Sequence, residues 1–160
     1  MVEFDSQVND FIHQMRRLVP DKDTQRKMTS AGAQYMAKEL SMDTKAKHYD
    51  AKHHIPKKFR GKAVAHLADS IDYTDTNLDG AVDGTATVGF KGASTSGVNH
   101  ARIARFLNDG TKKMHGDHFV EHAREDHAND MFKKMHDVYQ DSVKGGRYQW
   151  NYRLTRRRIW

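Results

Sequence analysis

The spacing of apolar residues changes twice along this chain, and these changes restrict the folds that it can adopt. Near the N-terminus apolar side chains recur every three or four residues, which predicts an amphipathic helix ended by Pro20; they are Phe4, Val8, Phe11, Ile12, Met15 and Val19. In the middle of the chain the period falls to two, as in strands, with the apolar positions Ile71, Tyr73, Ala86, Val88 and Phe90. A helical stripe returns in the last third with Val120, Ala123, His127, Met131, Met135 and Val138. Helices at both ends and a hairpin between them predict an α+β domain.

Local signals place the remaining elements. Asp23 or Thr24 is expected to cap a second helix, whose inner side carries Met28, Ala31, Tyr35 and Leu40. Residues 41–61 lose the pattern and predict an exposed loop or a lightly structured arm. A short helical pattern follows at Val64, Leu67, Ala68 and Ile71, and a turn rich in Asp, Asn and Gly joins the two strands.

The second half of the chain carries similar signals. Residues 92–97 predict a flexible stretch, and Ala101, Ile103, Ala104 and Leu107 a short helix that Gly110 ends in a left-handed cap. Residues 112–115 could add a further strand to the sheet. Asp117 is expected to cap the last long helix, and Gly145-Gly146 to stop it.

The predicted architecture is one α+β domain with helices packed on one face of a small antiparallel sheet. This domain covers residues 1–144, and residues 145–160 form an extended basic and aromatic tail. Hydrophobic residues make up only 37% of the chain, charged residues make up 30%, and the mean hydropathy is -0.90. A core this thin fits a subunit that completes its burial against neighbours, although a merely polar monomer would have a similar composition.

Composition also excludes several classes of protein. The chain has no Cys, which excludes disulfides and thiolate metal sites. No apolar stretch is long enough to span a bilayer, and the first residues are acidic and lack the apolar region of a secretory signal. We therefore expect no membrane association, and synthesis in the cytoplasm.

Two motifs resemble metal sites but lack essential ligands. Residues 75–80 match the start of a calcium-binding loop, but Ala86 stands where a bidentate Glu is needed; a hairpin turn is the better interpretation, and weak calcium binding stays open. His118, Glu121 and His122 match an inverted zinc-protease signature, but no Glu lies well downstream as a third ligand. His53 and His54, near His48, fit a solvated surface better than a metal site. No set of nucleophile, base and orienting group is evident, so we expect neither catalysis nor a cofactor.

The C-terminal run holds most of the excess positive charge. The chain has a net charge of +6, and residues 147–160 contain five Arg but no Asp or Glu. Arg interleaved with Tyr and Trp fits a protein interface best, while phosphate contact with base stacking, and simple disorder, stay open. The candidate docking residues here are Arg147, Tyr148, Trp150, Tyr152, Arg153, Arg156, Arg157, Arg158 and Trp160.

Residues 99–123 read NHARIARFLNDGTKKMHGDHFVEHA and resemble the small neck proteins of long-tailed phages, the tail-completion or head–tail joining family. That family shows a short helix, an acidic-or-Asn, Gly, Thr turn, a loop and an aromatic-led final helix. Here Ala104, Phe106, Leu107, Gly110 and Thr111 fall on the first part of the pattern, and Phe119 and Ala123 begin the final helix. Residues 61–71 and 87–90 resemble the segment before the family's first strand and its second strand. The family's usual Glu before Gly-Thr and the Pro before the aromatic are absent, and the basic tail is not a family feature.

The resemblance implies a structural protein of the virion at the head–tail junction, made in the host cytoplasm. Such proteins form a ring, here expected to be hexameric, that binds other neck and tail proteins. Residues 45–58, residues 92–97 and the tail are the natural contact arms, and Lys112 and Lys113 could face acidic neighbours or the DNA that passes through the neck. The alternative is a nucleic-acid-binding protein that uses the basic aromatic tail.

Overall fold

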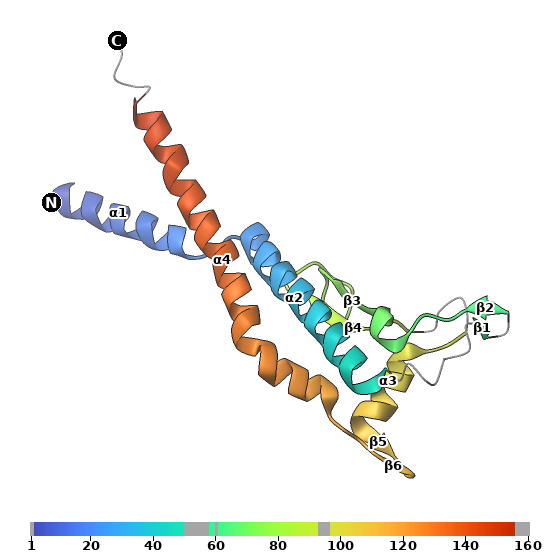
Figure 1. Cartoon of the computed structure of the whole chain (residues 1–160). Helices are drawn as coiled ribbons and strands as arrows, with labels where there is room; N and C mark the ends of the chain where they lie inside the picture. Colours follow the sequence, from blue (N-terminus) through green and yellow to red (C-terminus); the bar gives the residue numbers. More distant parts are fainter. Residues whose placement is uncertain (1, 50–57, 60, 93–96, 156–160) are drawn as a thin grey trace.

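The computed structural model describes residues 2–49, 58–59, 61–92 and 97–155, and its fold is α+β as expected (Figure 1). Its helices are α1 (Val2–Leu18), α2 (Lys22–His48), α3 (His100–Asp109) and α4 (Phe119–Thr155), with a short 3-10 helix, η1 (Leu67–Ser70). Its strands are β1 (Lys58–Phe59), β2 (Lys62–Ala63), β3 (Ile71–Thr74), β4 (Thr87–Phe90), β5 (Gly110–Thr111) and β6 (Met114–His115). Among these described residues, no helix is long and apolar enough to cross a membrane.

Helices α2 and α4 lie side by side and form the frame of the molecule (Figure 1). Their close approach depends on Gly32, since a Cβ at this position would stand 2.9 Å from the Met135 side chain. Two His–Asp pairs add polar links to α4 and the turn before it: His127 Nε2 lies 3.1 Å from Asp43, and His48 Nε2 lies 3.1 Å from Asp117. The predicted inner stripe of α4 therefore does face α2, and His127 belongs to it.

The ends of α2 differ from the sequence-based expectation. The cap is Asp21 rather than Asp23 or Thr24, because the Asp21 carboxylate accepts the Thr24 amide hydrogen at 2.7 Å. The helix also continues to His48, so the predicted loop at residues 41–61 was wrong for its first eight residues. Thr44 is fully buried, and basic residues in the last turn oppose the negative end of the helix dipole. Residues 50–57 and 60 lie outside the described part.

The predicted hairpin is confirmed. Strands β3 and β4 pair antiparallel, with Ile71 opposite Phe90 and Tyr73 opposite Val88. Helix α2 packs against both strands and α3 packs against β4. Strands β5 and β6 pair only with each other, so the expectation that residues 112–115 extend the sheet was wrong. Two residues per strand are enough for a tight turn but too few to reach the longer hairpin.

The core lies where α2, η1, α3 and the start of α4 meet. Phe119 is completely buried there, and its ring meets the rings of His48 and Phe90 edge-on, with centroids 4.8 and 5.9 Å apart. The other buried members of this cluster are Leu40, Leu67, Ala104 and Ala123.

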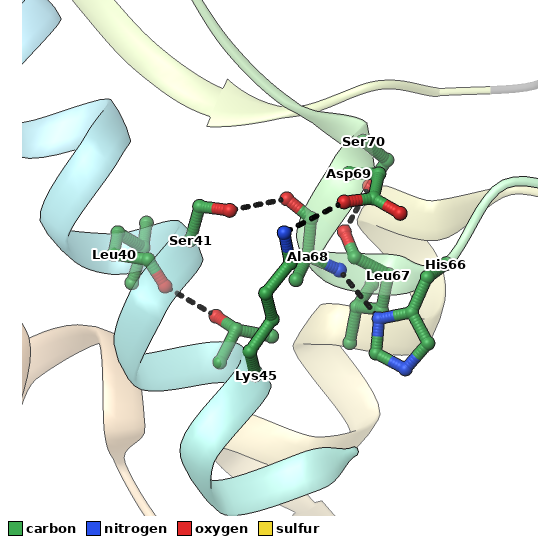
Figure 2. Close-up of polar contacts among 9 residues, drawn as sticks. Leu40, Ser41, Lys45, His66, Leu67, Ala68, Asp69 and Ser70 are labelled. Carbon is green, nitrogen blue, oxygen red and sulfur yellow. Dashed lines mark hydrogen bonds and ion pairs between the residues drawn. The ribbon is translucent and has the colours of Figure 1, made fainter. Parts of the chain in front are cut away.

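Polar contacts fix η1 against α2 (Figure 2). The Ser41 hydroxyl donates to the Ala68 carbonyl at 2.9 Å, and the Lys45 ammonium lies 3.1 Å from Asp69. At the start of η1, Nδ1 of His66 accepts the Ala68 amide hydrogen at 3.2 Å, so this histidine acts as the N-cap. The predicted short helix at Val64–Ile71 is thus a single 3-10 turn held mainly by side chains.

Helix α4 does not stop at Gly145-Gly146, which corrects the predicted helix end and the extended conformation of the first part of the tail. It continues to Thr155. Each Gly in a helix interior costs about 1 kcal/mol relative to Ala, and no Pro stands within the helix to break it. Residues 156–160 lie outside the described part.

Helix α1 projects away from the rest of the molecule (Figure 1). The predicted helix is confirmed, but its apolar stripe does not enter the core. Val8, Phe11, Ile12 and Met15 are between 39% and 61% exposed. The Tyr139 hydroxyl donates to the Leu18 carbonyl at 2.9 Å and links the end of α1 to α4.

Candidate docking surface

The segment that carries the family resemblance is built around one buried amide side chain, Asn108, at the end of α3 (7% exposed). Its Oδ1 accepts the Val120 amide hydrogen at 3.0 Å in the first turn of α4. Its Nδ2 donates to Asp109 at 2.9 Å and to Glu121 at 3.2 Å, and its backbone carbonyl accepts the His118 amide hydrogen at 3.2 Å. Asn108 therefore joins the end of α3 to the start of α4.

Two glycines allow the chain to turn back at this junction. Gly110 ends α3 as expected, with a positive φ of 83°, although its ψ of -177° is extended rather than left-handed helical. A Cβ there would stand 2.7 Å from the Met114 carbonyl oxygen, and a Cβ on Gly116 would overlap the Asn108 carbonyl oxygen. Larger residues at either position would push the two strands of the turn apart.

The result of this junction is a short hairpin, β5–β6, that extends from the domain (Figure 1). Lys112 and Lys113 form its two-residue turn and are exposed, as a docking role requires. Met114 is 41% exposed beside them. The hairpin thus presents two positive charges and one flexible apolar side chain at the surface.

The outer face of α3 continues this exposed region on the adjacent element. Ile103 and Phe106 are 40% and 42% exposed, and the Arg102 guanidinium stacks 5.3 Å from the centroid of the Phe106 ring. We call Arg102, Ile103, Phe106, Lys112, Lys113 and Met114 the α3–hairpin surface. Arg and aromatic side chains of this kind are enriched at the centres of protein interfaces.

A groove of about 260 Å³ lies between α3, β4 and the start of α4. Its floor is apolar, and Arg105, Asn108 and Asp109 stand at its polar edge. Asp109 is 3.4 Å from Arg105. Hydrogen bonding from the Asn108 amide, supported by Arg105, lowers the pKa of the Asp109 carboxyl, so the groove edge carries an ion pair of Arg105 and Asp109.

The structure does not bring all the predicted docking residues together. Lys112 and Lys113 lie at one end of the molecule, and the C-terminal end of α4 lies at the other (Figure 1). The backbone of Arg147, Tyr148, Trp150, Tyr152 and Arg153 belongs to the last turns of α4, whereas Arg156, Arg157, Arg158 and Trp160 lie outside the described residues. The hairpin and the tail are therefore two separate candidate surfaces.

Two side chains of the calcium-like loop, Asn77 and Asp83, form hydrogen bonds within the loop itself. Oδ1 of Asn77 accepts the amide hydrogens of Asp79 and Ala81 at 3.0 and 2.9 Å, and its Nδ2 donates to Asp83 at 2.9 Å. The Asp83 carboxylate also accepts from the Thr85 amide and hydroxyl. These bonds describe a self-supporting turn between β3 and β4.

The zinc-like motif is also divided among structural roles. His118 precedes α4 with a positive φ of 50°, and Glu121 accepts the Asn108 amide. Within the described part of the chain, no three His, Cys, Asp or Glu side chains gather as a metal site would require. Of the other histidines considered as a metal site, His48 lies 3.1 Å from Asp117, and His53 and His54 fall outside the described residues.

Sequence reasoning missed Asn108 as the organising residue of the junction. Its partners Val120 and Glu121 lie twelve and thirteen residues away, beyond the reach of a local pattern. A helix-ending Asn before Asp-Gly was the only local signal.

Comparisons with protein-family models, curated proteins and solved structures find no match for this chain.

Proposed function

We propose that this protein is a structural subunit of a phage neck, a tail-completion or head–tail joining protein. In this role it forms a ring at the head-proximal end of the tail and joins tail to head by docking, without catalysis. The observation that carries the proposal is the build of residues 99–123. Four of the positions that fall on the family pattern belong to the junction, since Ala104, Phe119 and Ala123 are buried and Gly110 makes the turn. Phe106 and Thr111, which also fall on the pattern, are exposed beside the junction.

The distribution of large apolar side chains supports a subunit that completes its burial with partners. Among the described residues, only four buried hydrophobic side chains are larger than Ala: Met36, Leu40, Leu67 and Phe119. In the same described part of the chain, fourteen large hydrophobic side chains are exposed. Exposed apolar surface of this extent favours association, because it stays in water only at a free-energy cost of about 25 cal/mol per Å².

We assign the contact between neighbouring subunits in the ring to the α3–hairpin surface. Ring closure needs a head-to-tail contact, in which one surface of a subunit meets a different surface of the next. The α3–hairpin surface is suited to one half of that contact, since Phe106 and Met114 provide apolar area and Lys112 and Lys113 provide charge. Its acidic counterpart is then a different surface of the neighbouring subunit.

Light scattering of the full-length protein across a concentration series, with negative-stain microscopy, tests this proposal. Six chains of 18.4 kDa give a particle of about 110 kDa with a central opening. Phe106→Asp should reduce the particle to smaller species, because it places a charge in the apolar contact. Leu78→Asp is the matched control, since Leu78 is 90% exposed on the β3–β4 loop, outside the proposed contact. A wild-type chain that never forms rings, or rings that Phe106→Asp leaves intact, would contradict the assignment.

A nucleic-acid-binding protein is the second candidate, favoured by the position of the basic aromatic run at a free end of α4 (Figure 1). Each phosphate contact contributes a slope of about 0.9 to the fall of log binding constant with log salt concentration. Replacing Arg156, Arg157 and Arg158 together by Ala should then lower the slope by up to about 3. Unchanged binding in the triple variant would exclude the tail as the DNA site.

A further inference from the structure

Helix α1 has an apolar face that no part of the described chain covers. The exposed fractions are 39% for Val8, 61% for Phe11, 41% for Ile12 and 48% for Met15. Val19, directly after the helix, is 68% exposed. A 17-residue helix with one uncovered apolar side requires a partner for that side, and the order of its residues indicates which partner.

The apolar stripe reads the same in both directions along the helix. In the sequence it occupies positions 4, 8, 11, 12, 15 and 19, so the successive gaps are four, three, one, three and four residues, and Val19 stands just beyond the helix end. At 100° per residue the five positions within α1 fall within about 50° of the centre of one face. The midpoint lies between Phe11 and Ile12.

From this symmetry we propose that the apolar face of α1 pairs antiparallel with the same face of a second copy of this chain. A two-fold axis passes between Phe11 and Ile12 of both helices. Val8 then lies opposite Met15 of the other copy, and each Phe11 lies opposite an Ile12. Two-fold contacts are the commonest form of association between identical chains, and they require a self-complementary surface of this kind.

The exposed area is sufficient for a real but reversible contact. Val8, Phe11, Ile12, Met15 and Val19 together expose roughly 500 Å², within the range of the largest apolar patch on an ordinary monomer. Burying this area on both copies gives a total of about 1,000 Å², in the range of weak and transient interfaces. We therefore expect a dimer that dissociates on dilution rather than a permanent one.

The charge order of the helix sequence fits the antiparallel direction. The first half of α1 contains Glu3, Asp5 and Asp10, and the second half contains Arg16 and Arg17. At 100° per residue Asp5 and Arg16 fall beside the apolar face, whereas Glu3, Asp10 and Arg17 fall on the opposite side of the helix. An antiparallel pair brings Asp5 of each copy near Arg16 of the other, whereas a parallel pair brings like charges together. The opposed helix dipoles favour the same direction.

This contact is separate from the proposed ring. A two-fold pair is complete with two chains, whereas a ring uses a head-to-tail contact through the α3–hairpin surface. One subunit can take part in both, so α1 would connect two subunits across a ring or between two rings. The inference therefore does not depend on the phage role, and either can fail alone.

Cysteine cross-linking tests the pairing directly, because the chain contains no Cys. Full-length chains with Val8→Cys and chains with Met15→Cys, carrying different tags, are mixed and treated with a short bis-maleimide. Antiparallel pairing predicts cross-links between the two variants at least tenfold more often than within either one. Identical positions would be separated by about 10 Å along the axis, since seven residues rise 1.5 Å each. Circular dichroism confirms that each variant keeps its helical content.

Each outcome decides the proposal. Cross-links mainly between Val8→Cys and Met15→Cys chains support it. Cross-links mainly within each variant would show a parallel pair, and absence of cross-links at concentrations up to 100-fold above those used for light scattering would show that the faces do not pair. Either of these results overturns the proposal.

A second measurement uses mass. The double variant Phe11→Asp, Ile12→Asp should shift the concentration at which pairs form upward by at least tenfold, while Leu78→Asp should leave it unchanged. A double variant that pairs like the wild type would overturn the assignment of the interface. Cross-linking between positions 8 and 15 in the Phe106→Asp background distinguishes the two contacts, because loss of the ring should leave this cross-link intact.

Discussion

Asn108→Asp is a nearly isosteric change that should destabilise the protein strongly at neutral pH. In the wild type, Oδ1 of Asn108 accepts the Val120 amide hydrogen while Nδ2 donates to the carboxylates of Asp109 and Glu121. The substitution preserves the first bond but replaces the donor by a carboxylate oxygen. Three carboxylates then meet at a position that is only 7% exposed in the native protein.

The magnitude follows from the bonds that are lost. A hydrogen bond to a charged group contributes at most about 1.5–3 kcal/mol, and water reduces this value here because Asp109 and Glu121 are exposed. In Asn108→Asp both of these bonds are replaced by repulsion between carboxylates. We expect a loss of about 3 kcal/mol in the free energy of unfolding at pH 7. Asn108→Ala removes the bond to Val120 as well, but it adds no charge, and water can replace the lost donor at the exposed Asp109 and Glu121 carboxylates, so its cost should be about 2 kcal/mol. The conservative change is therefore predicted to be the worse one.

The pH dependence has opposite signs in the two proteins. In the wild type the pKa of Asp109 is lowered, first by the Asn108 amide and then by Arg105, so its contribution is present above pH 3.8 and is lost as pH falls through the lower folded value. The new carboxyl at position 108 should have a raised pKa, because two carboxylates and burial disfavour its charged form. Its neutral form can donate a hydrogen bond, so the variant should regain stability relative to the wild type as pH falls from 7 to 4.5.

Urea unfolding followed by circular dichroism at pH 7 and pH 4.5 measures these differences. Asn129→Asp is the control, since Asn129 is exposed on α4 and away from the junction. The reasoning fails if Asn108→Asp is as stable as the wild type at pH 7. It also fails if the loss is the same at both pH values, because repulsion between carboxylates could not then be its cause.

Three further changes test other parts of the structure. His66→Ala should cost about 1 kcal/mol at pH 8 by removing the η1 cap. Burial lowers the pKa of His66 in the folded protein, so its contribution to the free energy of unfolding is complete above pH 6.5 and is lost as pH falls through that lowered pKa. Urea unfolding between pH 5 and 8 should show this decline in the wild type but not in His66→Ala. Gly116→Ala should lower the free energy of unfolding by at least about 3 kcal/mol, measured by thermal unfolding, because the new Cβ would overlap the Asn108 carbonyl oxygen. Gly92→Ala is the control and should change little, since a Cβ at position 92 meets no atom within 4 Å. The double variant Lys112→Glu, Lys113→Glu should change the free energy of unfolding by less than about 0.5 kcal/mol, because both residues are exposed. It should nevertheless form fewer rings, as measured by light scattering, and intact rings would exclude these lysines from the contact.

Local patterns predicted the parts of the fold that depend on near neighbours. The alternation of Ile71, Tyr73, Val88 and Phe90 predicted the hairpin, because the two sides of a strand alternate with a period of two. The helix end at Gly110 was also predicted, since a positive φ is available to Gly at little cost. Both signals lie within a few residues of the structure that they specify.

Other features depend on residues that are distant in the sequence. The polar residues 41–48 were interpreted as a loop, yet Thr44 is buried and Ser41 and Lys45 bind η1 about 25 residues later. Gly145-Gly146 was interpreted as a stop, although a long helix tolerates two costs of about 1 kcal/mol. For Asn108 the partners come from α4, and nothing in its local sequence identifies them.

The uncovered face of α1 follows from the same thin core. A helix of 17 residues is marginal in water on its own, and most helices in proteins gain their stability by packing an apolar face. The core around Phe119 offers α1 no such packing, and the described contact between α1 and α4 is a polar one, from Tyr139 to the Leu18 carbonyl. The sequence nevertheless keeps large apolar residues at every position of one α1 face. That combination favours a helix that becomes fully stable only when another surface covers it, so the helical content of the first 18 residues should rise with protein concentration if that surface is a second α1.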